Sequence, residues 1–169
     1  MRKLLFFLAP ALLLFACGES KVDDGKGDVV QQNIEATHVV NEAFKTGDIS
    51  RIDSVVSQDF VDHTDRGDMS RDSLKAMIQN MRQFFPDMKM EVLHEIADSS
   101  YVYTWMRFTG NSDGKSGMPA GPYDMQALEV NLLRDGKIIE HWEFMNVQDV
   151  INYLPPPAPA AVDSSAMKP

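Results

Sequence analysis

The order of the secondary-structure patterns predicts an α+β domain, in which three N-terminal helices pack on one face of a curved antiparallel sheet. Segments with helical spacing of apolar residues occupy the first half of the chain, up to about residue 85. From residue 88 onward, apolar and polar residues alternate with period 2, which is typical of strands with one buried face. Consecutive helices followed by consecutive strands indicate an α+β fold rather than alternating β-α units.

The first two predicted helices meet at Gly47. The first helix has apolar residues at helical spacing: Val30, Ile34, Val40, Ala43 and Phe44. Gly47 is suited to end it, and Asp48 can cap a second helix up to Val56. A short strand is expected next, over residues 59–63, followed by a polar loop over residues 64–69.

The third predicted helix begins after Ser70, which is a suitable N-cap, and ends before Pro86. Its apolar stripe keeps the i, i+3, i+4, i+7 spacing: Leu74, Met77, Ile78, Met81 and Phe85. Because such a stripe must be buried to stabilise the helix, we expect these residues to face a cavity or core against the sheet.

Four strands are expected after Pro86, over residues 88–97, 101–109, 124–133 and 138–145. The glycine-rich segment 110–121 separates the second strand from the third. Asp135-Gly136 has the composition of a hairpin turn between the last two strands. A short C-terminal helix is indicated by Val147, Val150, Ile151 and Leu154.

The N-terminus has the pattern of an export signal. Arg2 and Lys3 precede an apolar stretch over residues 4–15, which is too short to span a bilayer. Leu14-Phe15-Ala16-Cys17 resembles a bacterial lipobox, in which the cysteine is lipidated. The alternative is an ordinary secretory signal with a chance cysteine. Cys17 is the only cysteine of the chain, so thiol catalysis and disulfides are not expected in the mature domain.

These observations predict a signal peptide (1–16), a lipid-anchored linker (17–27), one domain (28–154) and a disordered Pro/Ala-rich tail (155–169). We expect the protein to be a lipoprotein of the bacterial cell envelope, anchored to the outer membrane and facing the periplasm. The chain carries 25 acidic and 16 basic residues, and removal of the signal peptide takes away two of the basic ones. This acidity excludes nucleic acid as a partner.

Three stretches resemble the SnoaL-like polyketide cyclase family of the cone-shaped nuclear transport factor 2-like superfamily. They are residues 59–63, the Phe85-Pro86-Asp87 joint, and the segment 136–142, whose sequence is Gly-Lys-Ile-Ile-Glu-His-Trp. The resemblance covers about residues 28–154. It implies a pocket at the wide end of the cone, lined by one sheet face and capped by the helices. It also implies an aldol-type cyclisation by an aspartate, with no metal or organic cofactor.

Carried over by this resemblance, the acid/base aspartate falls on or near Asp124. The family's Gly-Thr-His segment corresponds to Gly110-Asn111-Ser112, so its histidine is missing here, which favours ligand binding over cyclisation. A carboxylate at the mouth of an apolar face would have a raised pKa, as acid/base catalysis requires. The alternative is a strand-start aspartate that faces water.

His63 is the second catalytic candidate. It lies at a strand end among carboxylates, where an imidazole can shuttle protons near neutral pH. It can equally be a rim residue that is hydrogen-bonded to the adjacent loop. The acidic residues around it do not follow a calcium-loop pattern, so no metal site is expected.

Tyr103, Trp105, Met77 and Trp142 are the candidate ligand-pocket residues. Tyr103 and Trp105 share one strand face with Tyr101, which forms an aromatic row suited to a flat ligand. Such a row can also be core or a dimer surface. His141 and Trp142 must point to opposite faces of their strand. The sequence does not say which of those faces is the pocket.

The sequence leaves three functions open. The first is a membrane-anchored domain that holds a small, largely apolar molecule without changing it. The second is a cofactor-independent cyclase, isomerase or hydrolase that uses Asp124. The third is a homodimeric interaction domain that works through the outer sheet face.

Overall fold

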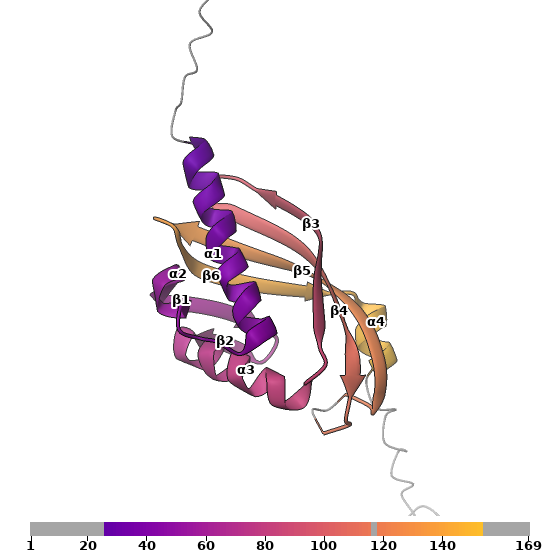
Figure 1. Ribbon diagram of the computed structural model, residues 1–169. Coiled ribbons are helices and arrows are strands. Elements are labelled where there is room, and N and C mark those ends of the chain that lie inside the picture. Colours follow the sequence, from indigo (N-terminus) through magenta and orange to yellow (C-terminus); the bar gives the residue numbers. More distant parts are fainter. Residues whose placement is uncertain (1–25, 116–117, 154–169) are drawn as a thin grey trace, which may run out of the picture.

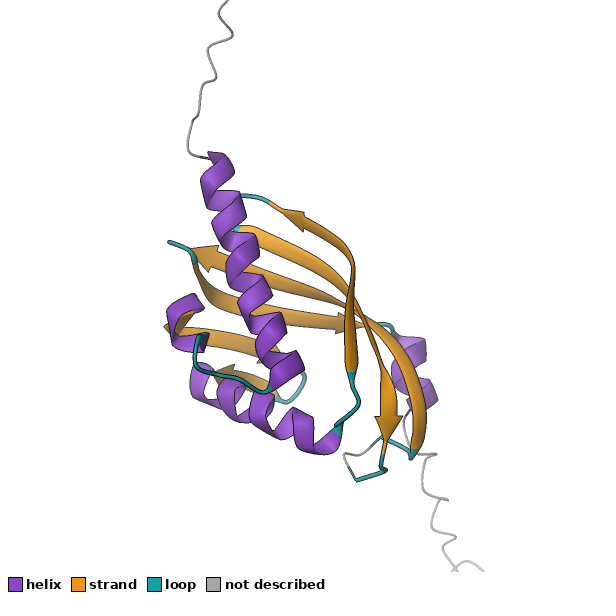
Figure 2. Cartoon of the chain, in the orientation of Figure 1, coloured by secondary structure: helices purple, strands orange, loops and turns teal. Residues whose placement is uncertain are grey.

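The computed structural model describes residues 26–115 and 118–153. They form a six-stranded sheet with the strand order β2-β1-β6-β5-β4-β3. Three helices cover one face of this curved sheet, and a fourth lies apart from them beside the ends of β4 and β5 (Figures 1 and 2). The predicted α+β class and the packing of helices on one sheet face are therefore confirmed. The predicted signal peptide, Cys17 and the C-terminal tail lie outside the described residues.

The helices begin and end close to where the sequence signals place them. The elements are α1 (Lys26–Thr46), α2 (Ile52–Val55), α3 (Arg71–Phe84) and α4 (Val147–Tyr153). Gly47 follows α1 with φ +79°, and its amide donates to the Ala43 carbonyl, which is the expected glycine C-cap. The second helix is only one turn long because Val56, which is completely buried, already begins the first strand.

The sheet is mixed, whereas the sequence analysis predicted an antiparallel one. Its strands are β1 (Val56–Thr64), β2 (Gly67–Ser70), β3 (Lys89–Ala97), β4 (Tyr101–Ser112), β5 (Gly121–Arg134) and β6 (Lys137–Met145). All neighbours pair antiparallel except β1 and β6, which pair parallel. A parallel pair needs a long crossover connection, and here α3 and four strands (β2, β3, β4 and β5) intervene between β1 and β6. The segment 67–70, expected as part of a loop, pairs with β1 as a short edge strand.

The hydrophobic core lies between the helices and the middle of the sheet. Its buried members come from α1, α2, β1, α3, β4 and the β5–β6 hairpin: Ala36, Ala43, Ile52, Val56, Phe60, Leu74, Ile78, Val102, Leu133 and Ile138. Asp135 and Gly136 both have positive φ, as the predicted hairpin turn requires. Helix α1 (indigo in Figure 1) crosses the sheet above this core.

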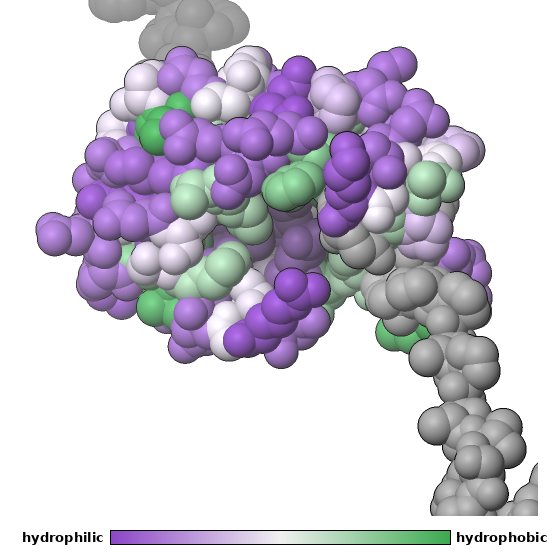
Figure 3. Space-filling view, turned by 90° about the horizontal axis from the view of Figure 1, so that it is seen from below, coloured by the Kyte–Doolittle hydropathy of each residue, from purple (hydrophilic) through white to green (hydrophobic). Residues whose placement is uncertain are grey.

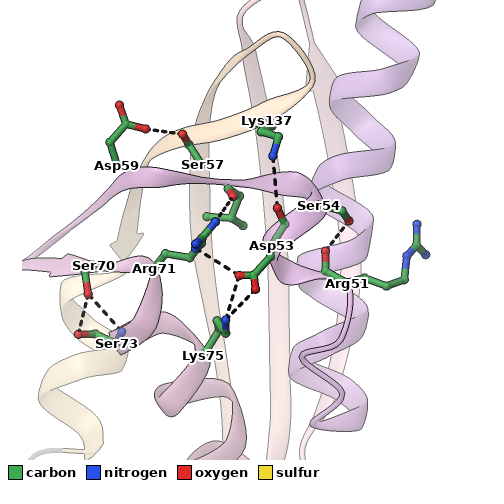
Figure 4. Close-up of polar contacts among 11 residues, drawn as sticks. Arg51, Asp53, Ser54, Ser57, Asp59, Ser70, Arg71, Ser73, Lys75 and Lys137 are labelled. Carbon is green, nitrogen blue, oxygen red and sulfur yellow. Dashed lines mark hydrogen bonds and ion pairs between the residues drawn. The ribbon is translucent and has the colours of Figure 1, made fainter.

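Polar contacts hold α3 against α2 and β1 (Figure 4). Lys75 Nζ lies 2.9 Å from Asp53 Oδ1, and Arg71 Nε lies 3.3 Å from the same atom. Arg71 also donates to the Val56 carbonyl at 3.2 Å. At the start of α3, the Ser70 hydroxyl accepts from the Ser73 amide, which confirms Ser70 as the N-cap. These contacts fix the helix whose apolar stripe faces the sheet.

Candidate functional site

A cavity of about 680 Å³ lies between α3, the end of α1 and the inner face of the sheet. It opens at the lower end of the molecule, where the space-filling view shows a hollow with pale apolar residues around it and a hydrophilic residue deep inside (Figure 3). Helices α1 and α3 contribute only apolar side chains to its lining: Val40, Phe44, Leu74, Met77 and Met81. This volume accommodates a small organic molecule.

Methionine dominates the apolar wall. Eight of the chain's 11 methionines line the cavity: Met69, Met77, Met81, Met88, Met90, Met118, Met125 and Met145. Because the methionine side chain is unbranched and polarisable, such a wall can adapt to apolar ligands of different shapes. Of the residues predicted to form the ligand pocket, Met77 is the one that lines this cavity.

The polar part of the cavity is built by β1, β5 and β6. Asp62 and His141 are register partners in the parallel β1–β6 pair, and His141 Nδ1 lies 2.8 Å from Asp62 Oδ1. Asp62 is only 4% exposed. Glu129 and Glu143 are register partners in the β5–β6 pair and also line the cavity. Residues directly opposite in an antiparallel pair have Cβ atoms about 5 Å apart. Four ionisable side chains therefore gather on one small area of the inner sheet face.

The combined effect of burial and nearby charges raises the pKa values of Glu129, Glu143 and His141. Burial, together with the negative charges of Glu143 and Asp62, raises the pKa of Glu129 to about 7, against the attraction of His141. Burial likewise raises the pKa of Glu143. For His141, burial lowers the pKa, but the hydrogen bond to Asp62 and the nearby carboxylates raise it overall. Groups that titrate near pH 7 in a cavity can both accept and donate protons there.

The structure contradicts the expected environment of Asp124. Its carboxylate accepts hydrogen bonds from Arg107 Nε at 2.8 Å and Nη2 at 2.6 Å. This side-chain hydrogen bonding lowers the pKa of Asp124, whereas a raised pKa was predicted. Asp124 pairs with Thr109 on the outer face of the sheet and does not line the cavity. The physical basis for acid/base catalysis at Asp124 is therefore absent.

His63 lies at the rim of the cavity, with both ring nitrogens engaged. Nδ1 lies 3.0 Å from Asp68 Oδ1, and Nε2 lies 3.0 Å from Glu140 Oε2. The imidazole stacks on Trp142 at a centroid distance of 4.8 Å. The hydrogen bond to Glu140, supported by the one to Asp68, raises the pKa of His63 against a smaller effect of burial. Of the two alternatives for His63, these contacts match the hydrogen-bonded rim residue.

The aromatic candidates Tyr103, Trp105 and Trp142 point away from the cavity, which corrects their prediction as pocket residues. In β4 the inner face carries Val102 and Thr104, both fully buried, so Tyr103 and Trp105 are on the outer face and are 37% and 45% exposed. Trp142 pairs with Val130 and Val130 with Tyr103, which places all three on that outer face. Trp142 is opposite in direction to His141, as the alternation predicts.

Glu129 was not predicted as a site residue, and the faces of β6 on either side of Trp142 could not be assigned from the sequence. In β5 the even positions Leu128, Val130 and Leu132 are the more apolar set and share a face with Asp124, so they correspond to the apolar face at whose mouth Asp124 was expected. They form the outer face instead, and the odd positions, with Tyr123, Met125 and Glu129, face inward. Strand register could have identified Glu129. If His141 faces inward, Glu143 two residues later faces inward as well, and so does Glu129, its partner across the β5–β6 pair.

Within residues 26–115 and 118–153, no group of three or more His, Cys, Asp and Glu side chains has the geometry of a metal site. No helix in that part of the chain is long and apolar enough to cross a membrane.

Comparisons with known proteins agree with this architecture. The family model described as SnoaL-like polyketide cyclase matches residues 34–153. No curated protein matches the chain. IdmH of Streptomyces antibioticus, a candidate polyketide cyclase, is 25% identical, with a TM-score of 0.61 over 72% of this chain and 96% of its own.

Two further solved structures share the fold. A candidate SnoaL-like polyketide cyclase from a Jannaschia species is 19% identical, with a TM-score of 0.63 over 77% of this chain and 96% of its own. A Mycobacterium tuberculosis epoxide hydrolase of the LEH-like type is 14% identical, with a TM-score of 0.59 over 73% of this chain and 89% of its own.

Proposed function

The chain belongs to the SnoaL-like polyketide cyclase family, and we propose that its domain binds a small, largely apolar molecule in the cavity and transfers a proton on it. The observation that carries the proposal is the group of four ionisable residues Asp62, Glu129, His141 and Glu143 at one end of a methionine-lined cavity. A cyclase or isomerase needs such groups to remove a proton next to a carbonyl and to return one elsewhere.

The two kinds of side chain in the cluster take different roles. The ionised form of Glu129 is the base, because its pKa of about 7 leaves it near half-deprotonated at neutral pH. His141 is held by Asp62, and its raised pKa favours the protonated form, which donates to the oxygen on which negative charge develops. The carbon–hydrogen electron pair moves into an enolate, and the proton goes to the Glu129 carboxylate. Return of a proton to the same carbon, or to another one, completes an isomerisation.

Hydrogen–deuterium exchange tests this proton transfer without knowledge of the natural substrate. The purified protein is incubated in D₂O with 2-tetralone and with ethyl acetoacetate, and exchange next to the carbonyl is followed by proton NMR. We expect exchange above the buffer rate, with a loss of about 10²-fold in Glu129→Gln and in His141→Gln, in line with a single acid/base group. Asp124→Asn is the matched control and should keep the wild-type rate.

Binding without chemistry is the second candidate, favoured by Gly110-Asn111-Ser112, which lacks the histidine of the family's segment. Native mass spectrometry of the protein purified from its own host would then show a retained small molecule. In this case the two ketones would exchange no faster than in buffer. The Glu129→Gln variant would retain less of the bound molecule, and its ketone exchange rate would equal that of wild type.

A homodimer through the outer sheet face remains a proposal. That face exposes Trp105 (45%), Phe144 (57%) and Ile96 (72%), and an apolar patch of this kind marks an interaction surface. A second copy is the simplest occupant. Light scattering after size exclusion should give the dimer mass, and Trp105→Lys together with Phe144→Lys should give the monomer. A monomeric wild-type protein would exclude this dimer.

We also propose that Cys17 carries the lipid that anchors the domain to the bacterial envelope. The support is the lipobox-like Leu14-Phe15-Ala16-Cys17 segment. Cys17→Ala should abolish labelling by a fatty acid and release the protein from the membrane fraction. A variant that is still labelled and still membrane-bound would exclude the lipoprotein assignment. Gly18 in place of an aspartate at the next position favours the outer membrane, which sucrose-gradient separation of the two membranes tests.

A further inference from the structure

The charged side chains that line the cavity are all acids or histidines. The acids are Asp62, Asp65, Glu129 and Glu143, and no lysine or arginine of the described chain reaches the lining. Helices α1 and α3 contribute no charge to this lining. The four acids outnumber the two histidines, His63 and His141, so a ligand that carries a carboxylate or phosphate would meet net repulsion in this lining.

Within the cluster, negative charge is not fully balanced. His141 Nδ1 lies 2.8 Å from Asp62 Oδ1, so when His141 is protonated these two residues form an ion pair with no net charge. Glu129 and Glu143 lie opposite each other on β5 and β6, and neither makes an ion pair with a lysine or arginine among the described contacts. Burial, together with nearby negative charges, raises the pKa of both carboxyl groups. A cation placed between them would stabilise their ionised forms.

A second polar group, far from this cluster, independently points to a ligand. The Tyr123 side chain lines the cavity and is 4% exposed, and its hydroxyl has no hydrogen-bond partner. Burial and the charge of Asp87 raise its pKa to about 12, so it remains a hydroxyl donor at neutral pH. An unsatisfied buried hydroxyl costs free energy that a ligand acceptor would recover.

The two polar groups lie on one strand face, six residues apart. Tyr123, Met125 and Glu129 all face the cavity from β5. At the rise of a strand, six residues correspond to up to about 20 Å, and curvature of β5 shortens this distance. Between them β5 presents Met125 to the cavity, whose apolar wall is rich in methionine. The cavity therefore offers an anionic end, a long apolar middle and a hydrogen-bond donor at the far end.

We propose that this cavity selects elongated amphiphilic amines, with the protonated nitrogen between Glu129 and Glu143, the apolar body along the methionine wall and a hydrogen-bond acceptor directed to Tyr123. The inference rests on the proposed function in taking the same cavity as the ligand site, but it concerns the charge of the ligand and not its chemistry. A preference for amines would distinguish this cavity from a cavity that binds only neutral molecules.

Three probes of equal chain length test the charge selectivity: n-decylamine, n-decanol and n-decanoate, each below its micelle concentration. Their binding to the purified protein is measured by displacement of N-phenyl-1-naphthylamine fluorescence at pH 7. We expect the amine to bind at least about tenfold more tightly than the alcohol, because a charge-assisted hydrogen bond replaces a neutral one. The carboxylate should be the weakest of the three. Calorimetry in two buffers of different ionisation enthalpy should show proton release on amine binding.

Matched variants connect the selectivity to the cluster. Glu129→Gln combined with Glu143→Gln should reduce amine affinity to that of the alcohol and leave decanol affinity unchanged. Glu42→Gln, on the exposed side of α1, is the charge-matched control and should leave all three affinities unchanged. Circular dichroism melting verifies that each variant is folded. If the double variant does not fold, the single Glu129→Gln variant must still lose at least half of the tenfold preference.

Three results would overturn the proposal: equal or weaker binding of the amine than of the alcohol, a preference that survives the double variant, or no binding of any probe. These outcomes are separable from failure of the proposed function. Ketone exchange without amine preference removes only the inference on ligand charge. Amine preference without ketone exchange removes the proposed catalysis and leaves amine binding in place.

Discussion

Glu129→Gln is the substitution that most directly tests the electrostatics of the cavity, because it removes one ionisable group and preserves the shape of the side chain. The folded protein holds the Glu129 proton up to a pKa of about 7, whereas the ordinary value for glutamate is 4.5. A raised pKa means that the folded state binds the proton more tightly than the unfolded chain. The resulting stabilisation is complete below pH 4.5 and is lost as the pH rises through 7.

The size of this loss follows from the shift. One pKa unit corresponds to about 1.4 kcal/mol, so wild type should lose up to roughly 3 kcal/mol of unfolding free energy at Glu129 between pH 4.5 and 8. Glutamine is neutral throughout and has no such loss. Glu129→Gln also removes a negative charge that stabilises protonated His141. The loss of about 3 kcal/mol is therefore an upper value for the stability difference between the two proteins. His141 itself, with its raised pKa, loses stabilisation in the same direction in both proteins.

Urea unfolding followed by circular dichroism at pH 5 and at pH 8 measures the effect. We expect the stability difference between Glu129→Gln and wild type to shift in favour of the variant by about 2–3 kcal/mol between these pH values. Glu42→Gln, which alters an exposed glutamate of α1, should show no such shift. Identical pH profiles for wild type and Glu129→Gln would show that Glu129 titrates normally, and the acid/base role assigned to it would lose its basis.

Four further substitutions test the framework of the site. Ile78→Ala, at a fully buried core position of α3, should lower the free energy of unfolding by about 2–5 kcal/mol in urea titrations; a loss below 1 kcal/mol would contradict the packing. Ser70→Ala removes the N-cap of α3 and should cost about 1 kcal/mol in the same assay, with Ser70→Asp restoring it. Gly136→Ala places a side chain at φ +70° and against Gln32, and should lower the melting temperature through a loss of about 1 kcal/mol or more. Met77→Trp should fill the cavity and abolish probe displacement while the protein remains folded by circular dichroism; unchanged binding would place the ligand elsewhere.

Local patterns were sufficient for most elements of the fold, with the edge strand β2 as the exception. Ser70, Gly47 and the Asp135-Gly136 turn act through hydrogen bonds and backbone angles within a few residues, so their effects can be deduced from the sequence. The apolar stripe of α3 is equally local, because helical spacing alone decides that Leu74, Ile78 and Met77 share a face. The resemblance carried by residues 59–63 and 136–142 identified the family, which the family model over residues 34–153 confirms.

The residues of the site could not be predicted from local patterns in the same way, because they depend on which face of each strand turns toward the helices. Both faces of β5 carry apolar residues, so alternation cannot distinguish Leu128 and Val130 outside from Met125 and Glu129 inside. Asp124 was assigned through the resemblance, but its neighbour across the β4–β5 pair is Thr109 on the outer face, and Arg107 on that face engages it. No local pattern specifies that partner.

Apart from the edge strand β2 and the length of α2, the sequence by itself determined the secondary structure, together with the α+β class, the family and the Cys17 lipoprotein hypothesis, since each depends on neighbours along the chain. The tertiary structure alone decided the composition of the polar cluster, because Asp62, Glu129 and His141 come from three strands that are far apart in sequence. Their pKa values depend on burial and on charges across strand pairs. The parallel pairing of β1 with β6 brings Asp62 to His141, and long-range pairing of this kind is fixed only when the helices and the whole sheet pack together.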